Sequence, residues 1–568
     1  MSLAATAQGL LTVTVDSAGT LGQQLTDSLR FTIAALKVSG PLNGADIKIL
    51  QQMANRTKPR KVGDELLTEL DLSEVTIVEN KGGFRTRLNQ LPAAMFANCK
   101  TLETVTLPDS IESVSKSCFS GCTGLKEISI PDMVTIIDDY AFNGCSSLTS
   151  MTLPANLQKI ENHAFDGCSS LTAIDVPEGV TLIDNYAFTR CINLERIRLA
   201  DSHIERISNS AFASCERLSE IALPATVRII GGDAFKGCKN LSVAALPDML
   251  DEIGNNAFAG CASLRSIAIG TANRIGNAAF IDCTSLSTAT IGLTKRMGNS
   301  IFENCISLTS ASIDGSFQDV AEEFFAGCTS LQSVTLPSHV KTLGNRAFYE
   351  CKSLGTIELP TSLVKIGDHA FENCSNLKNI TIPKLVKQIG NDTFESCLSL
   401  DSVNIEGFIE EIEDDLFRYC RSLRYIKLPV SLRKIGDNAF EQCGMLEEVM
   451  LPISVTSIGD NAFEKCVGIT TLIVPAACTS IGSAAFRECS ALARLELPAA
   501  LKKVGGNAFT KCVSLRDIVT YAPNPPALNH STFKGVPLQA CKVTVPRGCK
   551  NTYQKNKSWS KMPVIVEL

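Results

Sequence analysis

The 568-residue sequence has neither a long run of apolar residues nor an excess of charge of one sign. No segment approaches the roughly 18 consecutive apolar residues that a membrane-spanning helix needs, so we expect no membrane span. The 53 Lys and Arg residues against 59 Asp and Glu residues leave a formal charge of −6. This balance provides no broad cationic surface for nucleic acid. Membrane-spanning and nucleic-acid-binding proteins are therefore disfavoured classes.

Residues that carry catalysis or metal binding are also scarce. The five His residues are scattered and no CxxC pair accompanies them, so the ligand spacing of a zinc site is missing. No GxSxG, HExxH or phosphate-binding glycine motif occurs in a suitable context. The acidic run 410–415 could mimic a cation site, but a solvated face is the favoured interpretation. We predict a protein without enzymatic activity, metal or cofactor.

Phenylalanine and cysteine are abundant instead, and they recur together. The chain has 25 Phe and 23 Cys but one Trp and seven Tyr. Nineteen Phe residues, from Phe96 to Phe509, are each followed three positions later by Cys. Successive Phe residues are 23 positions apart, except for one spacing of 24 and two of 22. A unit this short cannot bury a core alone, so the sequence predicts a repeat solenoid of about 19 units.

Each unit follows the pattern LxxIxLPxxLxxIGxxAFxxC, as in Leu148 to Cys168. Apolar residues two positions apart in LxxIxL predict a short strand with one buried face. Pro154 should end that strand because proline has no N–H for a further ladder bond. The second half favours a short second strand, followed by a tight turn or a helical piece. Equivalent strands of successive units should stack in parallel, about 4.8 Å apart.

The repeated pattern resembles the BspA-like, Treponema pallidum-type leucine-rich repeats over about residues 88 to 518. The resemblance implies a right-handed β/α-type superhelix. It also implies a bacterial surface or secreted protein, since several members of this group act as adhesins for host matrix proteins or other cells. The ends depart from the pattern and resemble the terminal modules of the same group. We therefore expect an N-terminal cap at 1–87, the solenoid at 88–518 and a C-terminal cap at 519–568.

The N-terminal cap should contain a strand, a turn at Gly40-Pro41 and a helix beginning near Asn43. The first residues have neither a basic segment nor a long apolar segment, so no signal peptide is visible. The resemblance implies that a secretory signal has been removed. A cytoplasmic member of the group is the alternative.

Nineteen cysteines occupy the repeat position from Cys99 to Cys512. One thiol per coil at a constant spacing favours a column of buried free thiols, because parallel neighbours need not present the torsion of a disulfide. Four cysteines lie elsewhere: Cys118, Cys478, Cys541 and Cys549. Cys541 and Cys549 flank a strand and a Pro-Arg-Gly turn, which would allow a disulfide between them. Two unlinked thiols are the favoured interpretation.

The residue between the two buried positions of each strand should point outward and form one exposed column along the array. The column consists of Thr106, Ser129, Thr152, Asp175, Arg198, Ala222, Ala245, Ala268, Thr290, Ser312, Thr335, Glu358, Thr381, Asn404, Lys427, Met450, Ile473, Glu496 and Val519. It holds no aromatic residue, which disfavours a sugar-binding surface. Its C-terminal residues are larger, and we select Lys427, Met450, Ile473 and Glu496 as candidate partner-binding residues. Coverage of these residues by the C-terminal cap is the competing interpretation.

A second irregularity lies at 264–325, where the strand-ending proline is replaced by Gly270, Gly292 and Asp314. Drift among redundant repeats is favoured there over a partner site. Together these features predict a monomeric, non-enzymatic scaffold that binds a protein ligand. The resemblance implies that this ligand is a host matrix or cell-surface protein. A structural or periplasmic assembly protein without a host ligand is the first alternative. An enzyme or carbohydrate-binding protein that merely carries the repeats is the second.

Overall fold

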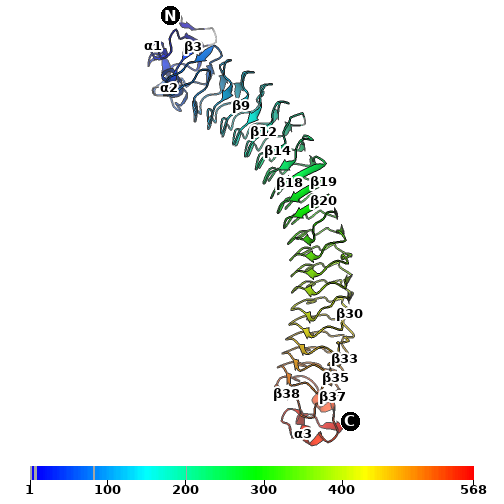
Figure 1. The fold of residues 1–568 in the computed structure, drawn as a ribbon. Helices are drawn as coiled ribbons and strands as arrows, with labels where there is room; N and C mark the ends of the chain where they lie inside the picture. The colour runs from blue at the N-terminus through cyan, green and yellow to red at the C-terminus, as the bar shows by residue number, and fades with distance from the viewer. Residues whose placement is uncertain (1–2, 6–8, 81–83, 200) are drawn as a thin grey trace. The chain divides into compact units, whose positions relative to one another are not determined.

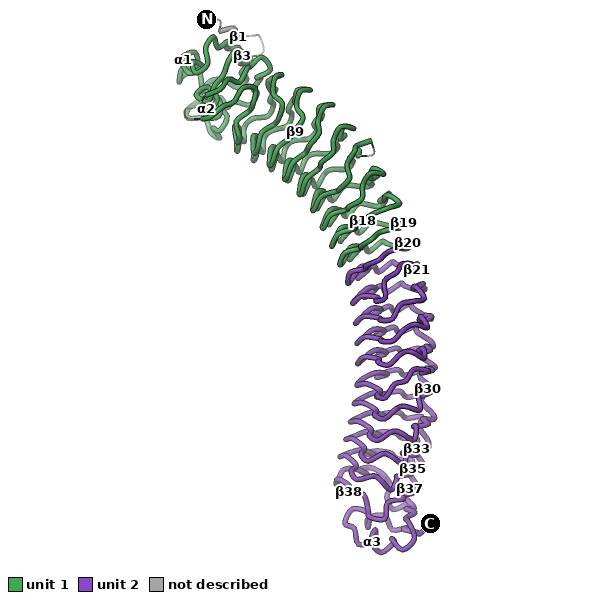
Figure 2. The backbone as a smooth tube through the Cα atoms, in the orientation of Figure 1, with its two compact units in different colours: residues 1–286 green, residues 287–568 purple. Residues whose placement is uncertain are grey.

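The computed structural model describes residues 3–5, 9–80, 84–199 and 201–568 (Figure 1). Parts of the N-terminal segment without a visible signal peptide, residues 1–2 and 6–8, lie outside the described residues. The chain forms two compact units, Met1–Leu286 and Ser287–Leu568 (Figure 2). No helix among the described residues is long and apolar enough to cross a bilayer.

Unit 1 begins with a mixed sheet that leads directly into the repeats. Its elements are β1 (Leu3–Ala5), β2 (Leu10–Thr14), α1 (Leu21–Gln24), η1 (Leu29–Phe31), β3 (Ala35–Leu42), α2 (Gly44–Ala54), β4 (Glu69–Asp71) and β5 (Val75–Ile77). Strand β1 pairs antiparallel with β2, whereas β2, β3 and β4 pair in parallel. Strand β4 then pairs with the first repeat strand, β6 (Thr104–Thr106). The N-terminal segment and the repeats therefore share one sheet.

The helix predicted near Asn43 is confirmed as α2. The Asn43 side chain accepts a hydrogen bond from the Ala45 N–H at 2.9 Å, and Asp46 completes a capping box. Ile47, Leu50 and Met53, which the sequence places on one side of this helix, are all buried. Together the cap and the apolar stripe fix where the helix starts and which face it buries.

The turn predicted at Gly40-Pro41 is wrong, because β3 continues through both residues. Gly40 has a φ of +93°, and a Cβ there would lie 2.2 Å from the Val15 carbonyl oxygen. Glycine is required at such a position because it alone adopts this conformation without a side-chain clash. Residues 35–37 of β3 pair with β4 and residues 40–42 pair with β5. The glycine thus bends a strand between two partners.

The repeats form two columns of short parallel strands. In unit 1 the first strand column contains β6, β8 (Glu127–Ser129), β11 (Ala173–Asp175), β13 (Arg196–Arg198), β15 (Glu220–Ala222) and β17 (Val243–Ala245). The second strand column contains β7 (Ser113–Val114), β9 (Ile136–Ile137), β10 (Lys159–Ile160), β12 (Leu182–Ile183), β14 (Arg206–Ile207), β16 (Ile229–Ile230) and β18 (Met249–Ile253). The register equals one repeat, as in the pairing of Ile160 with Ile183.

Unit 2 continues the same arrangement and ends in a five-stranded parallel sheet. Its first strand column contains β21 (Ser310–Ile313), β23 (Ser333–Thr335), β26 (Asn379–Ile382), β28 (Ser402–Ile405), β30 (Tyr425–Lys427), β33 (Thr471–Ile473), β35 (Arg494–Leu497) and β37 (Asp517–Thr520). Its second strand column contains β22 (Asp319–Val320), β24 (Thr342–Leu343), β25 (Lys365–Ile366), β27 (Gln388–Ile389), β29 (Glu411–Ile412), β31 (Lys434–Ile435), β32 (Ser457–Ile458), β34 (Ser480–Ile481), β36 (Lys503–Val504) and β38 (Ala527–Leu528). The chain ends with η2 (Leu538–Ala540), β39 (Lys542–Val545), α3 (Lys550–Lys555), η3 (Trp559–Lys561) and β40 (Val564–Glu567).

The second half of the repeat, which the sequence left open, forms a two-residue strand followed by turns. Among the described residues of 88–518, no helix occurs in the coils. The predicted solenoid of parallel strands is confirmed. Its coils combine strands with turns rather than strands with helices.

Glycine in place of the proline that follows the first strand accompanies a longer strand. Where the proline is replaced by Gly270, β19 (Ser266–Ile275) runs without interruption for 10 residues in unit 1. Where it is replaced by Gly292, β20 (Thr288–Met297) does the same in unit 2. Glycine keeps the N–H that proline lacks, so the ladder can extend from the first strand column into the second. Asp314, which also replaces this proline, does not have the effect, since β21 ends at Ile313.

The core of each coil is a stack of phenylalanine rings. In unit 1 the ring centroids from Phe96 to Phe280 are 5.1–5.6 Å apart, and in unit 2 the stack runs from Phe302 to Phe533. The repeat Phe side chains have no exposed surface. Each ring touches the equivalent ring of the next coil, so the apolar face of one coil is buried by its neighbours.

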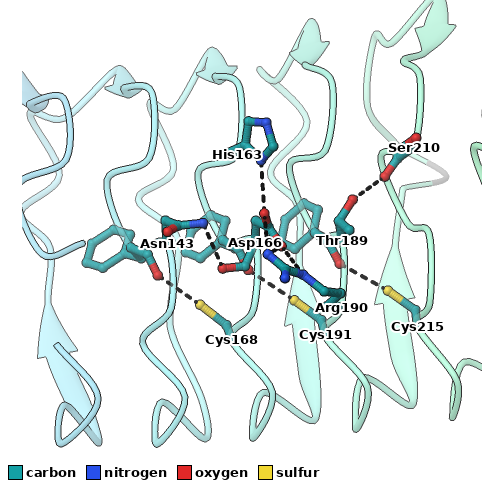
Figure 3. Close-up of polar contacts among 12 residues, drawn as sticks. Asn143, His163, Asp166, Cys168, Thr189, Arg190, Cys191, Ser210 and Cys215 are labelled. Carbon is teal, nitrogen blue, oxygen red and sulfur yellow. Dashed lines mark hydrogen bonds and ion pairs between the residues drawn. The ribbon is translucent and has the colours of Figure 1, made fainter. Parts of the chain in front are cut away.

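The repeat cysteines form a second buried column with a defined hydrogen bond. The Cys168 thiol donates to the Phe142 carbonyl at 3.2 Å, and Cys191 and Cys215 repeat this contact with Phe165 and Phe188 (Figure 3). All 23 cysteines are free, and all except Cys549 are buried. The prediction of buried free thiols is confirmed, and Cys541 and Cys549 are unlinked.

Replacement of Phe371 by Ala should lower the free energy of unfolding by about 3–5 kcal/mol, because it leaves a cavity between Phe348 and Phe394. The control is Phe408→Ala, since the Phe408 side chain is exposed and should change stability by about 0.5 kcal/mol or less. Urea unfolding followed by circular dichroism measures both. Equal effects of the two substitutions would contradict the role of the ring stack.

The thiols should react slowly with a maleimide in the native protein. Burial raises the pKa of Cys238, Cys283 and Cys512 from 9.0 to about 12, and the thiolate is the reactive form. Mass spectrometry should therefore find rapid labelling at Cys549 alone, and labelling of all 23 cysteines after unfolding. Rapid native labelling of the repeat cysteines would contradict their burial.

The same raised pKa values predict loss of stability in alkali. Above pH 9 the unfolded chain releases thiol protons that the folded chain retains, so the folded state binds more protons and its stability falls as the pH rises. Each fully buried thiol should contribute a loss of about 1.4 kcal/mol per pH unit. The urea midpoint measured from neutral pH to about pH 10 should fall steeply, and less steeply for Cys238→Ala/Cys261→Ala. An unchanged slope in that variant would contradict the assignment.

Candidate binding surface

The outward column predicted from the sequence lies as expected, with one exception. Its side chains are exposed or half-buried from Thr106 to Glu496, but Val519 is 5% exposed. The prediction that Val519 points outward is wrong. Val519 lies in β37, which pairs on one side with β35 and on the other with β39, where its register partner Thr544 is also buried. Val519 and Thr544 are therefore buried neighbours where the column meets the C-terminal segment.

Met450 and Ile473 are not buried in this way. Their exposed fractions are 84% and 58%, so the C-terminal segment does not cover them. Lys427 is exposed at the end of β30, while Glu496 is half-buried. The Glu496 carboxylate accepts hydrogen bonds from the Arg494 guanidinium at 2.8 and 3.0 Å and from the Tyr521 hydroxyl at 3.1 Å. Glu496 is thus held within the protein's own network.

A hollow of about 750 Å³ joins two of the four candidate residues. Met450, Ile453 and Ile473 line it together with Val474 and Pro475, and Tyr521 lies among its lining residues. Neither Lys427 nor Glu496 is part of this lining. Its volume falls in the range of binding pockets, which combine an apolar lining with a few polar groups.

The hollow opens where the first strand column is interrupted. Strand β30 pairs with β28, and β33 pairs with β35, but residues 447–451 between them belong to no strand. In other coils of unit 2 the corresponding N–H groups bond across coils, as from Arg424 to Asp401 at 2.9 Å and from Arg516 to Ala493 at 3.0 Å. No such bond joins residues 447–451 to an adjacent coil in the described part of unit 2. The sequence pattern of this coil gave no sign of the interruption.

The second strand column continues past this interruption. Strand β32 pairs with β31 and with β34, and the Phe440, Phe463 and Phe486 rings remain stacked. The coil is therefore held in register behind the hollow while its front segment lacks ladder bonds. Such a segment has few bonds to break when it adjusts to a ligand.

Exposed apolar side chains also follow the first strand column in four successive coils. They are Leu385, Phe408, Val430 and Ile453. Leu385 and Phe408 lie two positions after the strand-ending site, and Val430 and Ile453 lie one position after it. Other coils hold polar or small residues at these positions, such as Ser338, Ser362 and Ala499, but also the exposed Met133 and Met249. The sequence interpretation missed this row, because its members occupy two different positions of the repeat. Ile453 connects the row with the hollow.

A histidine, an aspartate and an arginine meet on the turn face of unit 1, but their contacts are structural. His163 Nδ1 lies 2.9 Å from Asp166, and the Arg190 guanidinium donates two bonds of 2.9 Å to the same carboxylate (Figure 3). The imidazole is stacked between Tyr140 and Tyr186, with centroid distances of 4.6 and 4.5 Å. Each of these side chains already contacts a side chain of an adjacent coil, so the cluster joins neighbouring coils.

The acidic run 410–415 is likewise engaged in contacts between coils. Glu411 pairs with Lys434, Glu410 lies 3.8 Å from Arg433, and the Asp414 carboxylate accepts from the Asp437 N–H at 2.7 Å. Within the described ranges, no group of three or more His, Cys, Asp or Glu residues could hold a metal ion. The run is an ion-paired face rather than a cation site.

Comparison with solved structures finds leucine-rich repeat proteins from bacteria. One from Bacteroides ovatus is 25% identical, covers 73% of this chain and 86% of its own, and has a TM-score of 0.35. The Treponema pallidum leucine-rich repeat protein is 28% identical over 32% of this chain and 81% of its own, with a TM-score of 0.25. A leucine-rich cell surface protein from Faecalibacterium prausnitzii is 22% identical over 65% of this chain and 86% of its own, with a TM-score of 0.29.

No curated protein matches the chain. The family model described as BspA type leucine-rich repeat region (6 copies) matches residues 89–218, 205–305, 295–424 and 410–538. These matches cover most of the chain and nearly the whole repeat array. They agree with the strand columns, the phenylalanine stack and the cysteine column described above. The chain therefore belongs to the BspA-type leucine-rich repeat family.

Proposed function

We propose that the protein is a non-enzymatic scaffold that binds another protein through the surface around Met450 and Ile473. The observation that carries this proposal is the hollow of about 750 Å³ between these two exposed apolar residues. Apolar side chains on a well-packed array give contact area with little ordering cost on binding. The alternative of a carbohydrate-binding surface is less well supported, because the hydroxyl of Tyr521 at the hollow is already bonded to Glu496.

The biological setting that we propose is the bacterial cell surface or the secreted fraction, with a host matrix or cell-surface protein as the ligand. Membership of the BspA-type family supports this setting. A structural or periplasmic assembly protein without a host ligand remains the alternative.

We further propose that residues 1–87 and 519–568 act as caps. Buried aromatic contacts at the C-terminal end, such as that between Tyr553 and Trp559, support this role.

Replacement of Met450 and Ile473 by Ser should weaken attachment to the ligand about tenfold or more, because each buried contact contributes about 1–2 kcal/mol. The melting temperature should hardly change, since both side chains are exposed. Binding to immobilised extracellular-matrix proteins and to cultured epithelial cells measures attachment. The matched control is Val243→Ser/Met249→Ser, which removes two exposed apolar side chains from unit 1.

Intact folding with unaltered attachment would place the binding surface elsewhere. A large drop in melting temperature would show that Met450 and Ile473 are covered. A wild-type chain that binds none of the matrix proteins or cells would contradict the adhesin role and favour the structural alternative.

A further inference from the structure

Two carboxylates beside the hollow lack the ion pairs that are common at equivalent positions. Glu447 and Glu448 line the hollow and are exposed. Elsewhere such residues pair across coils, as Glu103 does with Lys126 at 2.7 Å and Asp401 with Arg424 at 3.8 Å. Among the described residues of unit 2, no ion pair forms with Glu447 or Glu448.

The neighbours of the two carboxylates explain why they are uncompensated. One repeat before Glu447 lies Arg424, which is already paired with Asp401. One repeat before Glu448 lies Tyr425, and one repeat after the pair lie Thr470 and Thr471. The two negative charges therefore face the hollow without a cation from an adjacent coil.

A second hollow, in unit 1, provides an internal comparison. It has a volume of about 460 Å³ and is lined by Met151, Thr152 and Asp175. It too opens at an interruption of the first strand column, because residues 151–153 belong to no strand. Its carboxylate is compensated, since Asp175 lies 3.6 Å from Arg196 and 3.7 Å from Arg198. An interrupted ladder thus accompanies these two hollows, and of the two only the hollow beside Met450 has uncompensated carboxylates. A third hollow of about 520 Å³ lies beside the uninterrupted strands β26 and β28, and its Asp401 is paired with Arg424.

We propose that the hollow beside Met450 and Ile473 binds an extended segment of a partner protein in which a large apolar side chain is flanked by Lys or Arg. The inference rests on the proposed function and specifies the chemistry of the partner at the same surface. The apolar side chain enters between Met450, Ile473 and Val474, while a flanking cation meets Glu447 and Glu448. An acidic segment is repelled, so the carboxylates select among apolar segments.

Three matched fluorescent peptides test this chemistry on the full chain. The first carries Leu and Phe flanked by Lys, the second replaces each Lys by Glu, and the third replaces Leu and Phe by Ser. Fluorescence anisotropy should show binding of the cationic apolar peptide and at least tenfold weaker binding of the other two. Equal binding of all three peptides, or preference for the acidic one, would overturn the proposal.

Charge substitutions at the hollow provide a second test of the proposed partner chemistry. Glu447→Gln/Glu448→Gln should weaken the cationic apolar peptide about three- to tenfold and reduce its salt dependence. The control Glu127→Gln/Glu220→Gln removes the same charge from the position of Glu448 in two coils of unit 1, and affinity should not change. Glu447→Lys/Glu448→Lys should reverse the preference toward the acidic apolar peptide. Wild-type preference in that variant would overturn the proposal.

Hydrogen exchange locates the bound peptide. Amides of residues 447–451 lack backbone partners in adjacent coils and should exchange faster than those of β35 in the free protein. The cationic apolar peptide should slow exchange at 447–451 and in β33. Protection confined to other segments would overturn the assignment of the site.

The result distinguishes this inference from the proposed function. In one outcome, the Gln variant binds the peptide like wild type while Met450→Ser/Ile473→Ser loses attachment to matrix proteins or cells. That outcome would contradict the proposed cationic partner segment and support the binding surface around Met450 and Ile473. If the Ser variant keeps full attachment, the surface itself is wrong.

Discussion

The structure depends on the burial of each coil against the next coil. A unit of 23 residues has no core of its own, so its Phe ring, its ladder bonds and its thiol must all match the equivalent groups of a neighbour. The stacked rings and the thiol bond from Cys168 to the Phe142 carbonyl meet this constraint. The Phe and Cys positions of the repeat therefore hold one residue type throughout the array, while outward positions vary.

This division explains how a binding surface can arise without loss of the fold. Around Met450 the first strand column lacks its ladder bonds, yet β32 and the Phe463 ring keep their partners on both sides. Register is preserved by the second strand column and the ring stack. The front of the coil is then available to hold exposed apolar and acidic side chains that contribute little to stability.

The sequence predicted what depends on a local pattern of residues. The Phe stack, the buried thiols, the parallel strands and the α2 helix could be identified, because each is set by residue type at a fixed spacing. Val519 was misplaced because its strand pairs with β39 of the C-terminal segment, whose sequence departs from the repeat pattern. The hollow was not predictable either, since Val449 and Leu451 keep the strand pattern although residues 447–451 form no strand. Of the four candidate residues, Met450 and Ile473 line that hollow.

The constant register between coils also bears on how such a gene can change. Ile435 pairs with Ile458, and Ile458 pairs with Ile481. Each coil therefore makes nearly the same contacts with the coil before it and with the coil after it. Unequal recombination between repeats could remove or duplicate one coil. The neighbouring coils would still stack their Phe rings and form the hydrogen bond from the Cys thiol to the Phe carbonyl. Coil number could then vary among descendants, while the coil that carries Met450 is transmitted as a unit.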